Sequence, residues 1–231
     1  YGDFLYSQTT NGGSGLAPSP IAGVGPGGGN TLVVPANNPY NLFGVAIPSA
    51  TAPAVRTRTN ELGLRTSLNE TNTWRFVGGL KGDLVEDYCW DLSFNYARAS
   101  ATQTILGGGN GANMNTAMMP LLDAAGNYTY NAAGRPLSML QDSSGNNLPV
   151  YDIFAAPGFN DPATLDALKV SLFQNGVTDL RDISFRVRGK PFEAPGGRLA
   201  FALGVNARRE SVSASVDGLF AVGDGAGIAG A

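Results

Sequence analysis

Apolar and polar side chains alternate without interruption along residues 88–97. One parity is apolar and aromatic: Tyr88, Trp90, Leu92, Phe94 and Tyr96. The other is small or polar: Cys89, Asp91, Ser93, Asn95 and Ala97. A period of two places successive side chains on opposite faces of a strand, so this stretch predicts a strand with one apolar face. Its length also suits a tilted strand that crosses a bilayer, which needs about 9–11 residues.

The same alternation recurs in three further segments. Residues 74–82 precede the first strand and are joined to it by a tight connection at 83–87, which predicts an antiparallel hairpin over 73–98. Residues 183–189 and 198–210 flank a short segment containing Pro-Gly-Gly and predict a second hairpin over 182–212.

Long stretches rich in Gly, Pro, Asn and Ser separate the predicted hairpins. We expect loops over 9–72, 99–181 and 213–231. Three Asp/Asn-x-x-Gly segments, beginning at Asp123, Asn131 and Asp142, predict turns with a left-handed glycine. One short helix is expected over 162–174, with Asp161 as its N-cap and Leu residues at helical spacing.

Composition excludes several classes of function. The chain has 231 residues, of which 14% are charged, with 32 Gly, 14 Pro and a net charge of −3. We expect no nucleic-acid partner, because nothing builds a basic patch. With no His and one Cys, the sequence offers neither a zinc site of the usual ligands nor a His-based triad. No acid–base or nucleophile constellation is visible, so we expect no enzyme and no cofactor or metal.

The two hairpins share one plan: an apolar face, a polar face, a short connection at one end and a very long one at the other. A membrane barrel needs lipid-facing and lumen-facing residues in alternation, short periplasmic turns and long extracellular loops. A soluble β-sandwich shows the same alternation, but connections in sandwiches are usually short. The sequence therefore favours an all-β fold: a partial antiparallel transmembrane β-barrel, a meander of about 4–6 strands with long irregular extracellular loops.

Several segments also resemble TonB-dependent outer-membrane receptors. Residues 38–44, Asn-Pro-Tyr-Asn-Leu-Phe-Gly, are similar to a segment of that family, with Leu42 where Pro is commoner. Residues 72–82 and 90–96 resemble one barrel hairpin of the family, and residues 187–197 and 202–210 resemble another.

The resemblance implies a plugged barrel of about 22 strands in the outer membrane of a Gram-negative bacterium. This chain would be an internal fragment of that barrel domain, without the plug. The expected function is active uptake of a scarce nutrient such as a siderophore, cobalamin or a glycan. The expected partners are outer-membrane lipid, the receptor's own plug, the TonB system acting through the plug, and the ligand. Two alternatives stay open: a secreted or surface-displayed β-rich adhesion module, and a passive porin-like channel.

Strand parity nominates side chains that would face the lumen, where they would meet ligand, plug or water. They are Arg75, Lys81, Asp91, Asn95, Arg186, Arg188, Asn206 and Arg208. Arg186 and Arg188 are candidates for contact with an anionic ligand or with plug carboxylates. In the first long loop, Tyr40 and Phe43 are candidates for ligand contact or for packing of the loop itself.

Overall fold

The structure is a computed structural model that describes residues 1–16, 20–21, 32–48, 55, 57–85, 87–221 and 225–226. Parts of the predicted loops 9–72 and 213–231, and Glu86 in the first tight connection, lie outside these residues. The strands are β1 Gly2–Leu16, β2 Pro20–Ile21, β3 Val33–Val34, β4 Ile47–Pro48, β5 Thr57–Arg58, β6 Arg65–Val85, β7 Tyr88–Asn110, β8 Leu137–Gln141, β9 Asn147–Pro149, β10 Lys169–Ala194, β11 Gly197–Val216 and β12 Gly225–Ala226. The helices are a 3₁₀ turn Asn60–Leu62, α1 Gly111–Met118, α2 Pro162–Leu168 and α3 Gly218–Ala221.

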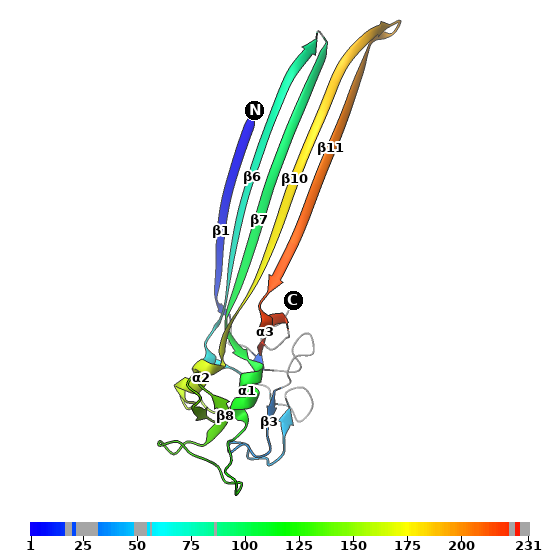
Figure 1. Cartoon of the computed structure of the whole chain (residues 1–231). Helices are drawn as coiled ribbons and strands as arrows, with labels where there is room; N and C mark the ends of the chain where they lie inside the picture. Colours follow the sequence, from blue (N-terminus) through cyan, green and yellow to red (C-terminus); the bar gives the residue numbers. More distant parts are fainter. Residues whose placement is uncertain are drawn as a thin grey trace. The chain divides into compact units, whose positions relative to one another are not determined.

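Five long strands form the main sheet in the order β1-β6-β7-β10-β11, an antiparallel meander-like arrangement (Figure 1). The short strand β12 pairs with the end of β7, where Gly225 lies opposite Asn110. The β6–β7 and β10–β11 connections are tight and lie at the same end of the sheet (Figure 1). The predicted mostly β meander is confirmed at this level.

The chain divides into two compact units. The sheet unit comprises Tyr1–Asn11, Asn69–Gln103 and Gln174–Ser215. The loop unit comprises Gly12–Leu68, Thr104–Phe173 and Val216–Ala231. The residues predicted as loops therefore build a compact unit of their own, which the sequence did not indicate.

Rings from adjacent strands, and in one pair from strands β7 and β11 on either side of β10, meet on one face of the sheet, which we call the apolar face. The ring contacts there are Trp74–Tyr96 at 4.7 Å between centroids, Tyr88–Phe201 at 6.0 Å, and Phe76–Phe94 and Trp90–Phe185 at 6.5 Å each. The members of each pair share the parity expected from the sequence, and such cross-strand aromatic pairs stabilise a sheet. The opposite face, which we call the polar face, carries the other parity.

Two glycines let aromatic rings lie directly on the backbone. A Cβ at Gly79 would come within 2.2 Å of the Tyr1 ring, and a Cβ at Gly189 within 2.6 Å of the Tyr88 ring. The close backbone approach that glycine permits inside a strand is realised at both positions. Gly79 also exchanges two backbone hydrogen bonds of 2.9 Å with Tyr1, which fixes β1 beside β6.

The strands are longer than the predicted hairpins. Residues 65–72, 99–110 and 169–181, which we expected in loops, belong to β6, β7 and β10. These extensions carry polar side chains on both faces, so they lack the apolar alternation that marks a strand in sequence. Side-chain bonds between strands accompany them: Gln8 Nε2 donates to Glu70 Oε1 at 3.0 Å.

The predicted helix 162–174 begins as expected but ends early. Asp161 caps α2 by accepting a 2.9 Å bond from the Ala163 amide, and the chain turns extended at Lys169. From there Leu172 is buried while Phe173 is 50% exposed, which is strand alternation rather than helical spacing. Helix α1, capped by Asn110, was missed by the sequence analysis. No helix among the described residues is long and apolar enough to cross a membrane.

The core of the loop unit draws apolar residues from both predicted loops. It contains Leu32, Val34, Ile47, Val55, Leu62, Met114, Ala117, Met118, Leu140, Leu148, Tyr151, Ile153 and Leu168. Helices α1 and α2 pack against each other there. The three predicted turns are confirmed, with φ of +84° at Gly126, +72° at Gly134 and +83° at Gly145.

Candidate functional site

The polar face of the sheet brings together side chains from strands β6, β7 and β10 and from Tyr1, which precedes β1. Arg75 Nε donates to Asn95 Oδ1 at 3.1 Å, and Tyr1 Oη donates to Asp91 Oδ2 at 3.4 Å. The hydroxyls of Ser93 and Ser184 lie 2.6 Å apart. These contacts show that residues which the alternation assigned to the polar parity of different strands lie on one face of the sheet.

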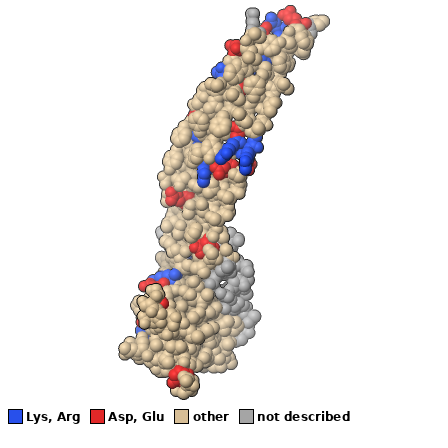
Figure 2. Space-filling model, viewed as in Figure 1, with Lys and Arg blue, Asp and Glu red and all other residues tan. Residues whose placement is uncertain are grey.

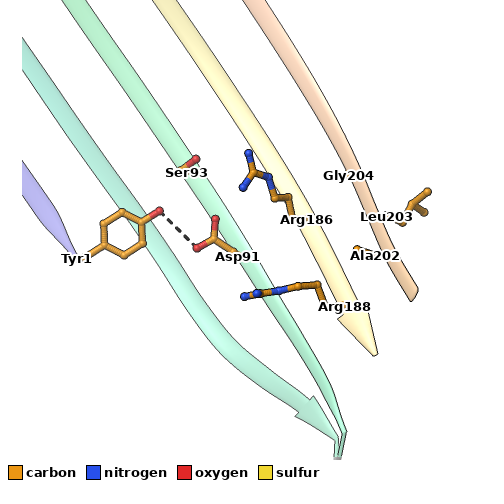
Figure 3. A pocket seen from close by; sticks show the side chains of 8 residues that line it. All are labelled: Tyr1, Asp91, Ser93, Arg186, Arg188, Ala202, Leu203 and Gly204. Atoms are coloured by element: carbon orange, nitrogen blue, oxygen red, sulfur yellow. Dashed lines mark hydrogen bonds between the residues drawn. The ribbon is translucent and has the colours of Figure 1, made fainter. Parts of the chain in front are cut away.

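An open hollow of about 640 Å³ lies on this face (Figure 3). It is lined by Tyr1, Asp91, Ser93, Arg186, Arg188, Ala202 and Gly204, and by Leu203, whose side chain points away from the two arginines in Figure 3. Figure 3 shows the long side chains of Arg186 and Arg188 extending from β10 toward the strand that carries Asp91 and Ser93. The small residues Ala202 and Gly204 on β11 leave the space open beside them.

The charge of the hollow is dominated by two guanidinium groups. Arg186 and Arg188 are both solvent-accessible, and within the described part of the chain neither lies within ion-pair distance of a carboxylate. Asp91 is the one acidic residue of the lining. Two arginines two positions apart on a strand point to the same side, where planar guanidinium groups bind carboxylate or phosphate oxygens.

The remaining predicted lumen residues do not line the hollow. Asn206 Nδ2 donates to Asp182 Oδ2 at 2.7 Å, and Arg208 is paired with Glu210. Arg75 is held by Asn95, and Lys81 is exposed nearer the β6–β7 connection. Of the eight candidates, the structure therefore brings Asp91, Arg186 and Arg188 together in one site.

Sequence reasoning missed two polar contributors to this site. Tyr1 reaches Asp91 because β1 lies beside β6, a pairing across 78 residues of chain that no local pattern reveals. Ser93 shares the parity of Asp91 and Asn95, so the alternation itself could have found it.

The two loop candidates differ sharply in environment. The Tyr40 ring packs edge-on against Phe159 with centroids 5.7 Å apart, and burial, followed by the negative charge of Asp152, raises the pKa of its hydroxyl. Phe43 is 70% exposed. Two asparagines hold the segment that carries Tyr40 and Phe43. Asn38 Nδ2 donates to the Met118 carbonyl at 2.7 Å, and Asn41 Nδ2 donates to the Val45 carbonyl at 2.8 Å.

A second polar cluster joins distant parts of the loop unit. Glu61 accepts hydrogen bonds from the Gly158 amide at 2.7 Å and from Asn160 Nδ2 at 2.6 Å. Asn160 in turn accepts from the Asp152 amide at 2.7 Å. Burial raises the pKa of Tyr151 beside this cluster, and the charge of Glu61 raises it further. Every one of these polar groups has a partner, so the cluster stabilises the unit rather than forming an open site.

The described residues hold no group of three or more His, Cys, Asp or Glu placed to bind a metal ion. Cys89, half-buried on β7, is a free thiol. Comparison of the chain with protein-family models, with curated proteins and with solved structures found no significant match.

Proposed function

We propose that this chain forms part of the barrel wall and of the extracellular loops of a TonB-dependent outer-membrane receptor that takes up a scarce nutrient. The observation that carries the proposal is the apolar face of the sheet, whose large side chains are exposed although they are continuous over all five strands. Exposed members include Phe4, Tyr6, Phe76, Leu80, Leu84, Phe94, Ile183, Phe185, Leu199, Phe201, Leu203 and Val205. An exposed apolar patch on this scale is typical of a surface that contacts lipid or a partner.

The dimensions of the apolar face favour lipid. From Trp74 to Leu84 the outward positions of β6 carry no charge, a span of about 33 Å along the strand. Tilted by about 40°, as strands in membrane barrels are, the span covers about 25 Å of depth, the height of the apolar band of such barrels. Trp74, Tyr96 and Tyr6 stand at one limit of the band, where aromatic side chains favour the membrane interface.

The sheet has the form expected of part of a barrel wall. Strands β1 and β11 stand at its two edges, each able to pair with a further strand. An open edge within lipid leaves backbone groups without partners, so the proposal requires further strands to complete the wall. The polar face would then line the lumen, and the long connections opposite the tight turns would be extracellular.

The hollow on the polar face supports a role in binding an anionic group. Arg186 and Arg188 would hold an anionic nutrient complex or, before uptake, carboxylates of the plug. Siderophores, cobalamin and glycans are the nutrient classes that the family resemblance implies. Energy would reach the receptor from TonB through the plug.

Membrane extraction tests the location. Cells expressing the full chain, meaning this sequence together with the further strands and the plug that the proposal requires, are fractionated, and outer membranes are washed with alkaline carbonate and then with detergent. We expect the protein to stay in the membrane through carbonate and to dissolve only in detergent. Release by carbonate, or recovery from the medium, would replace the receptor with a secreted or surface-displayed adhesion module.

Uptake tests the transport mechanism. Cells expressing the same full chain, plug included, are given candidate nutrients with and without an inhibitor that collapses the proton-motive force. We expect accumulation that stops with the inhibitor and weakens when Arg186 and Arg188 are both replaced by Ala. Uptake that ignores the inhibitor would indicate a passive porin-like channel, and unchanged binding by the double variant would remove the arginines from the site.

A further inference from the structure

Three arginines stand in a row on the apolar face of the sheet, just beyond the apolar band. On β7 the last aromatic position, Tyr96, is followed on the same face by Arg98. On β10 Ile183 is followed by Arg181, and on β11 Ala207 is followed by Arg209. One same-face step along a strand is about 6.6 Å. Each of the three strands therefore changes from apolar to cationic at this limit of the band.

Side-chain contacts join these residues into a cluster. Tyr96 Oη donates to Asp179 Oδ1 at 3.3 Å, and Arg98 Nη1 lies 3.9 Å from the same oxygen. The Arg181 guanidinium lies over the Tyr96 ring, 5.6 Å from its centroid. Arg181 is thus oriented by an aromatic ring at the limit of the band rather than by a carboxylate.

The cluster has a small hollow and an excess of positive charge. A space of about 130 Å³ is lined by Asp179, Arg181, Arg209 and Ser211. At about 30 Å³ per water in the liquid, this is room for about four waters, the size of a phosphate group rather than of a sugar. Three arginines against Asp179 leave a net charge of 3 − 1 = +2.

The other limit of the sheet is built differently. Near the tight turns Arg198 lies 3.0 Å from an Asp87 carboxylate oxygen and 3.1 Å from one of Glu193, so its charge is satisfied within the protein. At the limit that carries the three arginines, β1 and β6 place Gln8, Glu70 and Asn72 next to the band. These residues bond one another, and Glu70 supplies a negative charge there. Figure 2 shows that charged side chains on the face it presents gather in a few clusters separated by wide uncharged surface. Among the described strands, the unmatched positive charge beside the band is therefore that of β7, β10 and β11.

We propose that Arg98, Arg181, Arg209 and Ser211 bind the phosphate of an anionic lipid head group at the rim of the apolar face. Guanidinium groups bind phosphate oxygens in a bidentate manner, and the Ser211 hydroxyl is placed to donate as well. The acyl chains of that lipid would lie along the apolar band. The inference rests on the proposed membrane location but adds a site that neither transport nor the lumen hollow requires.

Lipid retention tests the site with a matched control. The full chain in neutral detergent is mixed with equal amounts of phosphatidylglycerol and phosphatidylcholine with identical acyl chains, and bound lipid is measured by native mass spectrometry. The test variant is Arg181→Gln with Arg209→Gln. The control is Arg75→Gln with Arg208→Gln, which removes the same charge from the opposite face of the sheet at residues that do not line the hollow. We expect wild type and control to retain phosphatidylglycerol preferentially and the test variant to retain roughly 10-fold to 30-fold less, the loss expected for two cations near anionic lipid.

The outcomes separate the lipid site from the membrane location. Insertion into vesicles of pure phosphatidylcholine, measured by protection from protease, tests the location without any anionic lipid. Insertion together with equal retention of both lipids would overturn the phosphate site and leave the receptor proposal standing, whereas failure to insert would overturn both. Competition by millimolar inorganic phosphate as effective as that by phosphatidylglycerol would assign the hollow to a free anion instead. If the double variant does not insert, Arg209→Gln alone serves as the test, with Arg208→Gln as its control.

Discussion

The sheet unit and the loop unit place their apolar residues in opposite ways. In the loop unit Met114, Met118 and Leu168 are fully buried, in a core collected from two long segments. In the sheet unit, side chains of similar size, such as Leu203 at 70% exposure and Phe4 at 66%, remain uncovered. The loop unit thus supplies its own apolar environment, whereas the described residues leave the apolar face of the sheet uncovered.

Their polar groups differ in the same way. Distant parts of the loop unit are joined by fully partnered bonds, such as those from Gly158 and Asn160 to Glu61. On the polar face of the sheet, Arg186 and Arg188 border an open hollow instead. Fully partnered polar groups thus characterise this cluster of the loop unit, whereas an open hollow with two arginines characterises the polar face of the sheet.

The largest expected effect is in the loop core. Met118→Ala removes a side chain with no exposed surface and leaves a cavity, so we expect the loop unit to lose about 2–5 kcal/mol of stability. Hydrogen exchange of the full chain measures this as lost protection within 104–173, with the sheet strands unaffected. Met139→Ala, at a position 54% exposed, is the control and should change little. Equal loss of protection in both units would show that the two do not hold their structure independently.

A charge on the apolar face tests what covers it. Leu203→Arg should destabilise the folded sheet in phosphatidylcholine vesicles by about 2–4 kcal/mol if the residue lies near the bilayer midplane. Ala202→Arg, one position away on the polar face, should be nearly neutral. Urea titration of the full chain in vesicles measures both. If Leu203→Arg changes stability by less than about 0.5 kcal/mol, as ordinary surface substitutions do, the apolar face does not meet lipid.

The polar link within the loop unit should contribute less. Glu61→Ala removes the acceptor of the Gly158 amide and of Asn160 Nδ2, and hydrogen bonds to a charged group contribute about 1.5–3 kcal/mol. We expect faster amide exchange at 158–160 and a pKa of Tyr151 closer to its ordinary value, although burial continues to raise it. Asp166→Ala, which breaks an exposed pair with Lys169, is the control. Unchanged exchange at 158–160 would mean that Glu61 does not hold this segment.

The alternation of apolar and polar residues was enough to predict most of the sheet, but it predicted little of the loop unit. The parity of Asp91, Arg186 and Arg188 follows from a period of two, so their shared face could be predicted from the sequence alone. The neighbour that completes the hollow, Tyr1, depends on a long-range strand pairing. The loop core could not be predicted, because Leu32, Met114 and Leu168 lie far apart in sequence and share no period. The prediction of a helix over 162–174 was wrong in its second half. There the tertiary packing of Leu172 in a strand prevailed over the helical spacing of the leucines.

The smallest expected effect concerns the three hairpin turns of the loop unit, which test whether its order extends to exposed tips. Asp123 and Asp142 each accept bonds from the backbone and side chain of an asparagine four residues on, at 2.8–3.2 Å, and these bonds hold the pKa of both carboxyls below the ordinary 3.8. A lowered pKa means that the contribution is complete above pH 3.8 and is lost as pH falls through the folded-state value. Asn131 makes the same backbone contacts, at 2.9–3.0 Å, without a titratable group.

Acid should therefore loosen two of the three turns. We expect the amide resonances of Asn127 and Asn146 to shift as the pH falls below 3.8, while that of Arg135, bonded to Asn131, stays nearly constant. Nuclear magnetic resonance of the full chain measures all three in one titration. Asp123→Asn should abolish the shift at Asn127 and preserve the turn, since the Asn131 turn already uses that side chain. Parallel shifts at all three amides would instead indicate acid unfolding of the whole loop unit, and its stability would then depend on carboxylates in its interior rather than on its apolar core.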